Sequence, residues 1–165
     1  MARKCFLSFH YKPDSWRVSQ VKNMGKIEGQ SILTSNSWEE VKKKGDKAIE
    51  DWINDQLKGK NCQIVLIGTK TAGRRWVKYE IEQAWNAGKG VLGIYVHNLK
   101  DANENQTDKG SNPFSSFTFG TKKTPMTNFA KTYDPPYSSS QYAYDYIKSN
   151  IEDWVEEAIR LRGTV

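Results

Sequence analysis

Two short apolar runs constrain the fold of this chain more than any other feature. Residues 62–68 (CQIVLIG) and 91–96 (VLGIYV) are nearly continuous in apolar side chains, which is typical of parallel strands buried on both faces. The segment between them, residues 74–85, has the spacing of an amphipathic helix and is followed by Gly88. A strand, a helix and a second strand in this order predict an α/β fold with a mostly parallel sheet.

The remaining segments extend this alternation on both sides. Residues 46–58 have a clear amphipathic pattern, with Asp46 as the expected N-cap and Gly59 as the stop. Further elements are expected at residues 4–9 (strand), 15–23 (helix), 32–33 (short strand), 98–128 (polar loop), 129–133 (edge strand) and 139–161 (C-terminal helix). We see no internal repeat or second unit, and we therefore expect one domain over residues 1–165.

Composition narrows the functional classes. The net charge of +6 favours an anionic partner, such as a nucleic acid, an acidic lipid or a phosphorylated small molecule. The charge is dispersed, however, and its one sharp run, Lys42 to Lys44, is expected to be a solvated loop. Because the sequence contains no nucleic-acid-binding motif, a nucleic-acid partner is not favoured.

Membrane, secretory and metal-binding classes are not favoured either. No apolar run approaches the ~18 residues of a membrane span, and no signal-peptide pattern is present, so we expect a cytoplasmic protein. Cys5 and Cys62 lack the spacing of a zinc site. We expect both to be buried free thiols, and we expect no metal site.

Glu80 stands out because it lies on the apolar side of its predicted helix. At roughly 100° per residue it falls within the stripe that contains Trp76, Ala84 and Ile81, whereas Glu82 falls on the polar side. A carboxylate on a core-facing stripe is costly unless it is paired or lines a cavity. The pattern leaves two interpretations open: a catalytic carboxylate, or a buried ion-pair partner of Lys70, Arg74 or Arg75.

The predicted sheet places Glu80 near a ligand-binding edge. In open parallel sheets, ligands bind outside the carboxyl ends of the strands, and both histidines, His10 and His97, follow such ends. The helix of Glu80 begins just after another strand end. The sequence has no glycine-rich phosphate loop and no G-x-S-x-G segment, so phosphate cradling by such a loop and serine hydrolysis are not indicated.

Two of these segments resemble motifs of a known family. Residues 6–10 (FLSFH) resemble the F-L-S-F-R motif of the first strand in plant-type TIR domains, with His10 in place of the usual Arg. Residues 76–81 (WVKYEI) resemble the W-x-x-x-E-[IL] segment that carries the catalytic glutamate of NAD-cleaving TIR domains. With the strand at residues 91–96, the chain resembles the TIR domain family, and it looks closest to the TIR-like ThsB proteins of bacterial Thoeris anti-phage defence systems.

The resemblance implies a flavodoxin-like three-layer sandwich with helices on both faces of the sheet. It also implies that NAD⁺ is a substrate, without a further cofactor, and that the nicotinamide–ribose bond is cleaved. The product would be an ADP-ribose-derived, cyclic or conjugated signal that activates a separate effector protein, and the chain would form a homo-oligomer on activation. By position Glu80 would be catalytic, and the pocket would be lined by Phe6, Ser8, His10 and Trp76. The resemblance also implies that Asp14 and Trp38 bind the substrate.

The chemistry is consistent with a single carboxylate. Glycosidic cleavage usually needs an acid for the leaving group, but nicotinamide departs from NAD⁺ as a neutral molecule and needs none. One carboxylate can then stabilise the oxocarbenium-like transition state, and Phe6 or Trp76 can stack on the nicotinamide ring. The polar segment 98–128 is either a lid that would exclude water or a disordered loop, and the sequence favours neither.

Two other functions remain open at this point. One is a non-enzymatic TIR module that recruits another TIR domain and needs no carboxylate in its pocket. The other is a basic nucleotide- or nucleic-acid-binding domain, for which a steep dependence of binding on salt is expected.

Overall fold

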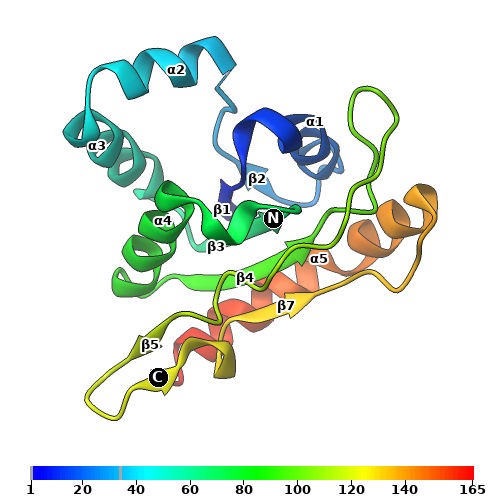
Figure 1. Cartoon of the computed structure of the whole chain (residues 1–165). Helices are drawn as coiled ribbons and strands as arrows, with labels where there is room; N and C mark the ends of the chain where they lie inside the picture. The colour runs from blue at the N-terminus through cyan, green and yellow to red at the C-terminus, as the bar shows by residue number, and fades with distance from the viewer. Residues whose placement is uncertain (1, 34) are drawn as a thin grey trace.

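Among the described residues, 2–33 and 35–165 of a computed structural model, five parallel strands form a central sheet (Figure 1). The strands of this sheet are β1 (Lys4–Ser8), β2 (Glu28–Gly29), β3 (Cys62–Ile67), β4 (Gly90–Tyr95) and β7 (Lys131–Tyr133). The helices are α1 (Tyr11–Lys22), α2 (Ser35–Lys43), α3 (Asp46–Leu57), α4 (Arg75–Asn86) and α5 (Ser140–Arg162), with 3-10 turns η1 (Thr71–Gly73) and η2 (Met126–Asn128). A separate small hairpin pairs β5 (Thr118–Phe119) with β6 (Thr124–Pro125).

The order of the strands is β2-β1-β3-β4-β7, which is the flavodoxin-like arrangement. From β1 the chain passes first to β2 on one side and then to β3 on the other. The segment that leaves β1 runs toward β2, and the segment that leaves β3 runs toward β4 on the opposite side. The two segments diverge at the carboxyl ends of β1 and β3, and this divergence opens a crevice where ligands bind in folds of this kind. The predicted α/β fold with a parallel sheet is therefore confirmed, and its flavodoxin-like order places a site above β1 and β3.

Helices cover both faces of the sheet and make two apolar cores. On one face α1 and α5 pack against Cys5 and Leu7 of β1, and on the other α3 and α4 pack against Phe6. The alternation follows from the two-residue period of a strand. Because Ser8 is two residues beyond Phe6, it also lies on the face that α4 covers.

Several predicted elements are confirmed with small shifts. The buried strands 62–68 and 91–96 correspond to β3 and β4, the edge strand to β7, and the C-terminal helix to α5. Cys5 and Cys62 are buried free thiols, as expected. Gly59 has a φ of 74°, which suits a helix stop, but Asp46 is the first helical residue and Gly45 occupies the N-cap.

Two elements predicted near the start of the chain have other bounds in the structure. Helix α1 begins at Tyr11 rather than residue 15, because Pro13 lies in its first turn, where no backbone N–H is needed. The second strand is Glu28–Gly29 rather than residues 32–33; beyond it, the Gln30 side chain continues the pairing by bonding Leu7 N and O at 2.8 and 2.9 Å.

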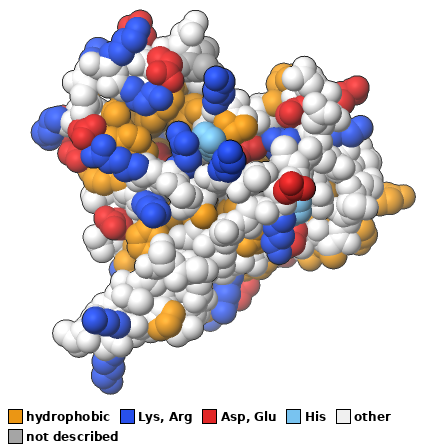
Figure 2. Space-filling model, in the orientation of Figure 1, with side chains coloured by type: hydrophobic (Ala, Val, Ile, Leu, Met, Phe, Trp, Pro, Cys, Tyr) orange, Lys and Arg blue, Asp and Glu red, His pale blue; other side chains and the backbone are white. Residues whose placement is uncertain are grey.

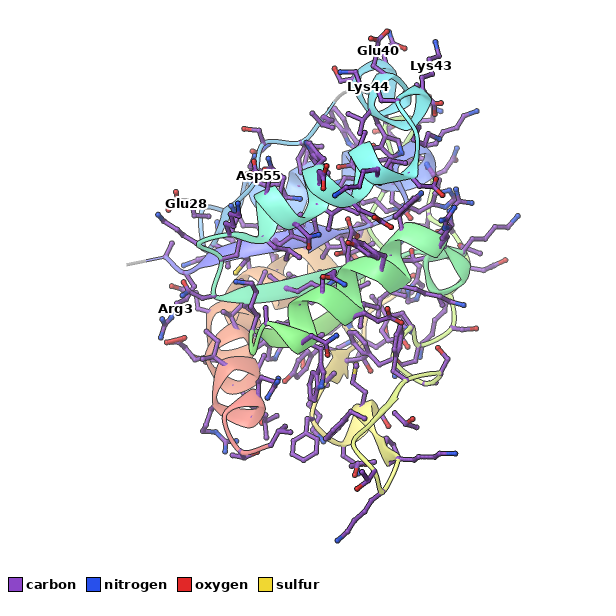
Figure 3. All side chains as sticks on the ribbon, turned by 90° about the vertical axis from the view of Figure 1, so that its left-hand side faces the viewer. Arg3, Glu28, Glu40, Lys43, Lys44 and Asp55 are labelled. Carbon is purple, nitrogen blue, oxygen red and sulfur yellow. The ribbon has the colours of Figure 1, made fainter. Side chains whose placement is uncertain are left out.

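The lysine run is also not a loop throughout. Lys42 and Lys43 close helix α2, a short helix that the sequence pattern did not indicate. Figure 3 shows Glu40, Lys43 and Lys44 extending outward at the far end of this helix. The inner side of α2 presents Trp38, which is buried against the core on the α4 face.

The polar segment after β4 is an irregular connection that contains the hairpin β5–β6 and η2. Its aromatic side chains pack against the carboxyl-terminal end of α4, where the Phe119 and Trp85 rings lie 4.9 Å apart. None of residues 98–128 lines the cavity of Glu80 described below. In the described structure the segment therefore does not line that site, and its role as a lid stays a prediction.

Candidate functional site

Most of the predicted site residues meet at one cavity of about 960 Å³ at the carboxyl ends of β1 and β3. His10 lines it from the end of β1, Trp38 from α2, and Trp76 and Glu80 from the first two turns of α4. Ser8 lies beneath this group, and its hydroxyl lowers the pKa of Glu80. The helix spacing that singled out Trp76 and Glu80 therefore describes one wall of a real cavity.

Phe6 does not reach the cavity, and the expectation that it lines the pocket is wrong. Its side chain has no exposed surface and packs in the core on the α4 face. It lies two residues deeper along β1 than Ser8, on the same side of the sheet. Phe6 therefore supports the floor of the site from below and cannot touch a ligand.

Glu80 is buried at the base of the cavity, with 5% of its surface exposed. Burial raises its pKa to about 8, and the hydrogen bond from Ser8 acts in the opposite direction. The ion pair with Lys70, Arg74 or Arg75 that the sequence left open is absent among the described residues. An unpaired carboxyl with a displaced pKa at a cavity floor is typical of a functional group.

Ser8 is itself held by a second buried polar residue. Gln63, on the neighbouring strand β3, donates from Nε2 to Ser8 Oγ at 2.8 Å. Gln63 is opposite Phe6 in the strand pairing and is fully buried, and its Oε1 has no hydrogen-bond partner among the described residues. A chain of polar side chains thus runs from the middle of the sheet to Glu80.

Aromatic side chains form the walls around Glu80. Tyr11, at the start of α1, stacks on Trp38 with ring centroids 4.9 Å apart and an angle of 8° between the rings. Trp76 is half-buried and meets Tyr79 edge-on at 5.6 Å. Burial, with a smaller contribution from Glu80, raises the pKa of Tyr11, so its hydroxyl stays protonated. These flat surfaces suit a planar ring.

Positive charge surrounds the mouth of the cavity. Lys12, Lys42, Arg74 and Arg75 line it, and Glu39 is the acidic residue beside them. Figure 2 shows Lys and Arg side chains gathered around a histidine on this face, beside an apolar patch.

These four cations are not equally available to a ligand. Lys42 pairs with Glu39 at 2.9 Å, and Arg75 pairs with Asp46 at 2.8 Å. Among the described residues no ion pair holds Lys12 or Arg74. Those two cations are therefore free to meet an anionic group.

His10 separates this cavity from a second one of about 950 Å³, which Lys12 also borders. Burial, together with Arg74 and Lys70, lowers the pKa of His10, which favours the neutral imidazole at pH 7. His10, in place of the plant-type Arg, thus removes a fixed positive charge from the boundary between the two cavities.

Asp14 borders the second cavity and not the cavity of Glu80. It forms a buried ion pair with Arg17 at 2.8 Å, and Arg17 also donates to Leu99 O and Asn105 O, each at 2.8 Å. Asp14 therefore helps to tie α1 to the connection after β4. Its expected place in the pocket of Glu80 is wrong.

Sequence reasoning missed three contributors to the site. Tyr11 lies ahead of residue 15, where the sequence predicts the first helix to begin, and the cationic rim is visible in the sequence only as dispersed charge. Gln63 had a recognisable signal, because it is the polar residue within the apolar run of β3. A side chain of this kind in a strand buried on both faces calls for a hydrogen-bonded partner.

Other site chemistries receive no support from the described residues. No group of three or more His, Cys, Asp or Glu side chains among them is placed to hold a metal ion. None of the described helices combines the length and apolar character needed to cross a membrane.

Comparison with known proteins agrees with the geometry. Residues 6–101 match the family described as the TIR-like domain of Thoeris protein ThsB. A protein of Bacillus cereus (strain MSX-D12), named "Putative cyclic ADP-D-ribose synthase ThsB1", is 37% identical over 119 residues. That similarity covers 69% of this chain and 62% of the relative, so the chain spans less than two thirds of the relative's length. Both the first-strand motif and the glutamate helix lie inside the matched region, and the chain belongs to the family of TIR-like domains of Thoeris protein ThsB.

Proposed function

We propose that this protein cleaves NAD⁺ at the bond between nicotinamide and ribose and forms a cyclic ADP-ribose product. The product would serve as a signal in anti-phage defence. The observation that carries the proposal is the buried carboxyl of Glu80, which no described Lys, Arg or His pairs with, at the base of an aromatic-walled and cation-rimmed cavity. The name of the Bacillus cereus relative supports the same reaction class.

The reaction matches a site with a single carboxylate. When the N-glycosidic bond breaks, its electron pair moves to the nicotinamide nitrogen, which loses its positive charge and leaves as a neutral molecule. No acid is needed for that step, and the ionised Glu80 would stabilise the positive charge that develops on the ribose. A hydroxyl or ring nitrogen of the same substrate would then attack the ribose carbon and close the ring.

Glu80 is also suited to take the proton that the attacking group releases. A base works best when its pKa lies near the operating pH, and the pKa of Glu80 is about 8. In the empty cavity at neutral pH much of this carboxyl is protonated. The pyridinium ring of NAD⁺ would favour the ionised form, because an opposite charge nearby lowers the pKa of a carboxyl.

The walls and rim fit the remaining parts of NAD⁺. Trp76 would stack against the nicotinamide, and the stacked pair Tyr11 and Trp38 provides a second aromatic surface. Arg74 and Lys12 would meet the diphosphate, because no ion pair occupies either cation among the described residues. The cavity excludes part of the solvent, which favours ring closure over hydrolysis.

Two further proposals concern partners. The cyclic product would act on a separate effector protein, and the chain would assemble with copies of itself when it is activated. Both follow from the family and from the resemblance stated above, and size-exclusion chromatography with and without NAD⁺ tests the second.

The test compares two glutamates of the same helix. Glu80→Gln removes the buried carboxylate, and Glu82→Gln is the matched control because Glu82 is exposed on the outer face of α4. Each variant is co-expressed with the effector protein, and the cells are infected with phage. NAD⁺, nicotinamide and cyclic products are then measured by mass spectrometry. We expect Glu80→Gln to abolish product and Glu82→Gln to retain it. Equal product from wild type and Glu80→Gln would refute the catalytic role, and equal protection without any product would favour an interaction module.

A further inference from the structure

The buried polar chain beneath Glu80 assigns a role to a residue of the neighbouring strand. Gln63 donates to Ser8 at 2.8 Å, and Ser8 lies on the face of β1 that α4 covers, where its hydroxyl lowers the pKa of Glu80. We propose that Gln63 is a positioning residue, which holds the Ser8 hydroxyl with its proton directed at Glu80 and so keeps the carboxylate form available. This inference deepens the proposed function and rests on it for its catalytic consequence.

The placement of Gln63 is costly for the fold. Its side chain is fully buried in a strand whose other members are apolar, and its Oε1 has no hydrogen-bond partner among the described residues. A buried acceptor without a partner destabilises the folded state, and an apolar side chain of similar size would avoid this cost. Packing alone therefore gives no reason for an amide here, whereas the bond from Nε2 to Ser8 does.

The direction of the hydrogen bond between Gln63 and Ser8 carries the argument. A serine hydroxyl has one proton to donate and can also accept hydrogen bonds. Because Gln63 Nε2 donates to Ser8 Oγ, the Ser8 proton is left to donate to Glu80, and that bond favours an ionised carboxylate. The acceptor oxygen of Gln63, if turned toward Ser8, would take this proton and suit a protonated Glu80 instead.

The pairing of β1 with β3 fixes the position of Gln63 relative to Ser8. Gln63 pairs with Phe6 in the register of β1 and β3, so Ser8 is two residues farther along the same face of β1. Both residues belong to strands at the centre of the sheet, where neither can move without disturbing the core. Ser8 and Gln63 are thus held more rigidly than the residues of the rim.

Other charged groups also act on Glu80 and must be considered in any titration. The groups that line the same cavity are His10, Tyr11 and Lys12 after β1, Glu39 and Lys42 of α2, and Arg74 and Arg75 at the start of α4. None of these belongs to β3. A substitution at Gln63 therefore changes the hydrogen bond to Ser8 and leaves every one of these charged groups in place.

The test is a direct titration of Glu80 by NMR, with ¹³C-labelled glutamate side chains. Its resonance is identified by its absence in Glu80→Gln. The series comprises wild type, Ser8→Ala, Gln63→Met and the double variant, with Gln83→Met at a half-buried position of α4 as the control. Gln63→Leu is a second apolar variant, and thermal unfolding followed by circular dichroism checks that each chain folds.

We expect the titration midpoint of Glu80 to rise by about one pH unit in Ser8→Ala and in Gln63→Met, which is the loss of one hydrogen bond to a charged group. The double variant should match Ser8→Ala alone, because Gln63 acts through Ser8, and Gln83→Met should match wild type. An unchanged midpoint in Gln63→Met and Gln63→Leu overturns the proposal, as does a double variant in which the two shifts add. Failure of both apolar variants to fold also overturns it, since the amide would then be needed for packing.

The titration uses no substrate, so it is independent of the proposed reaction. A wild-type protein that never consumes NAD⁺ would count against the proposed function and would leave the result on Gln63 standing. If the titration midpoint of Glu80 is unchanged in the Gln63 variants while NAD⁺ turnover is normal, the positioning role of Gln63 is refuted and the proposed function still holds.

Discussion

Replacing Glu80 by Gln should make the fold more stable at high pH, whatever reaction the protein catalyses. Glu80 is 5% exposed, and burial raises its pKa from 4.5 to about 8. In the unfolded chain the same carboxyl is solvated and ionises near 4.5. Gln is uncharged at every pH and has nearly the same shape, so its amide should pack as the protonated carboxyl does.

The direction of the effect follows from proton binding in the two states. Below pH 4.5 both states are protonated, and the carboxyl adds no pH dependence. Between pH 4.5 and about 8 the folded state keeps a proton that the unfolded state has lost, so the free energy of unfolding falls as pH rises. Above about pH 8 both states are ionised, and the loss levels off.

The size of the loss is large for a single residue. A displacement from 4.5 to about 8 corresponds to about 5 kcal/mol, at 1.36 kcal/mol for each pH unit. Even half of that amount is a substantial part of the ~5–15 kcal/mol that stabilises a typical domain. We therefore expect Glu80→Gln to be as stable as wild type at pH 4.5 and several kcal/mol more stable at pH 9.

Urea unfolding followed by tryptophan fluorescence measures the free energy of unfolding at half-unit steps from pH 4.5 to 9. Subtracting the wild-type curve from that of Glu80→Gln removes groups common to both, including His10 and His97. Glu82→Gln is again the control, and its curve should run parallel to wild type because Glu82 is exposed. A difference between Glu80→Gln and wild type that stays constant with pH would refute the reasoning, because it would mean that Glu80 ionises normally in the fold.

Three further outcomes follow from the structure. Arg74→Ala should raise KM for NAD⁺ with little change in kcat, and the effect should shrink at high salt; an effect on kcat alone would contradict a role in holding the diphosphate. Arg17→Met should destabilise the fold by ~3–5 kcal/mol in urea unfolding, because Asp14 would be left buried without its partner; a loss under ~1 kcal/mol would contradict this. Phe6→Ala should cost ~3–5 kcal/mol and leave the titration midpoint of Glu80 in place, since Phe6 lies in the core below the site; a shifted midpoint would contradict that placement.

The parts of the structure that the sequence predicts well are those with a strong periodic pattern. The apolar runs of β3 and β4 and the helix between them identify the parallel sheet, and the helix period places Glu80 and Trp76 on one face. Their meeting with His10 at the carboxyl ends of the strands then follows from the rule for open parallel sheets. These features depend on local spacing and on topology, both of which can be inferred without coordinates.

The parts that could not be predicted depend on contacts between distant segments. Helix α2 has nine residues and few apolar positions, and Trp38 becomes buried by packing against Tyr11 of α1 and Trp52 of α3. The two-residue strand β2 contains no apolar side chain, and its pairing is continued by the side chain of Gln30. The depth of Phe6 below the cavity likewise depends on how far β1 extends beyond it.

The stretches of sequence that line the cavity differ in how freely they can change. Glu80 comes from α4, which packs against the core, whereas the facing wall comes from α2, within the connection between β2 and α3. Connections of this kind tolerate changes in length and composition that strands do not. The wall formed by α2 can therefore change in sequence while Glu80 and the residues buried beneath it stay in place. Exchanging residues 35–43 between relatives would separate these two contributions in the laboratory.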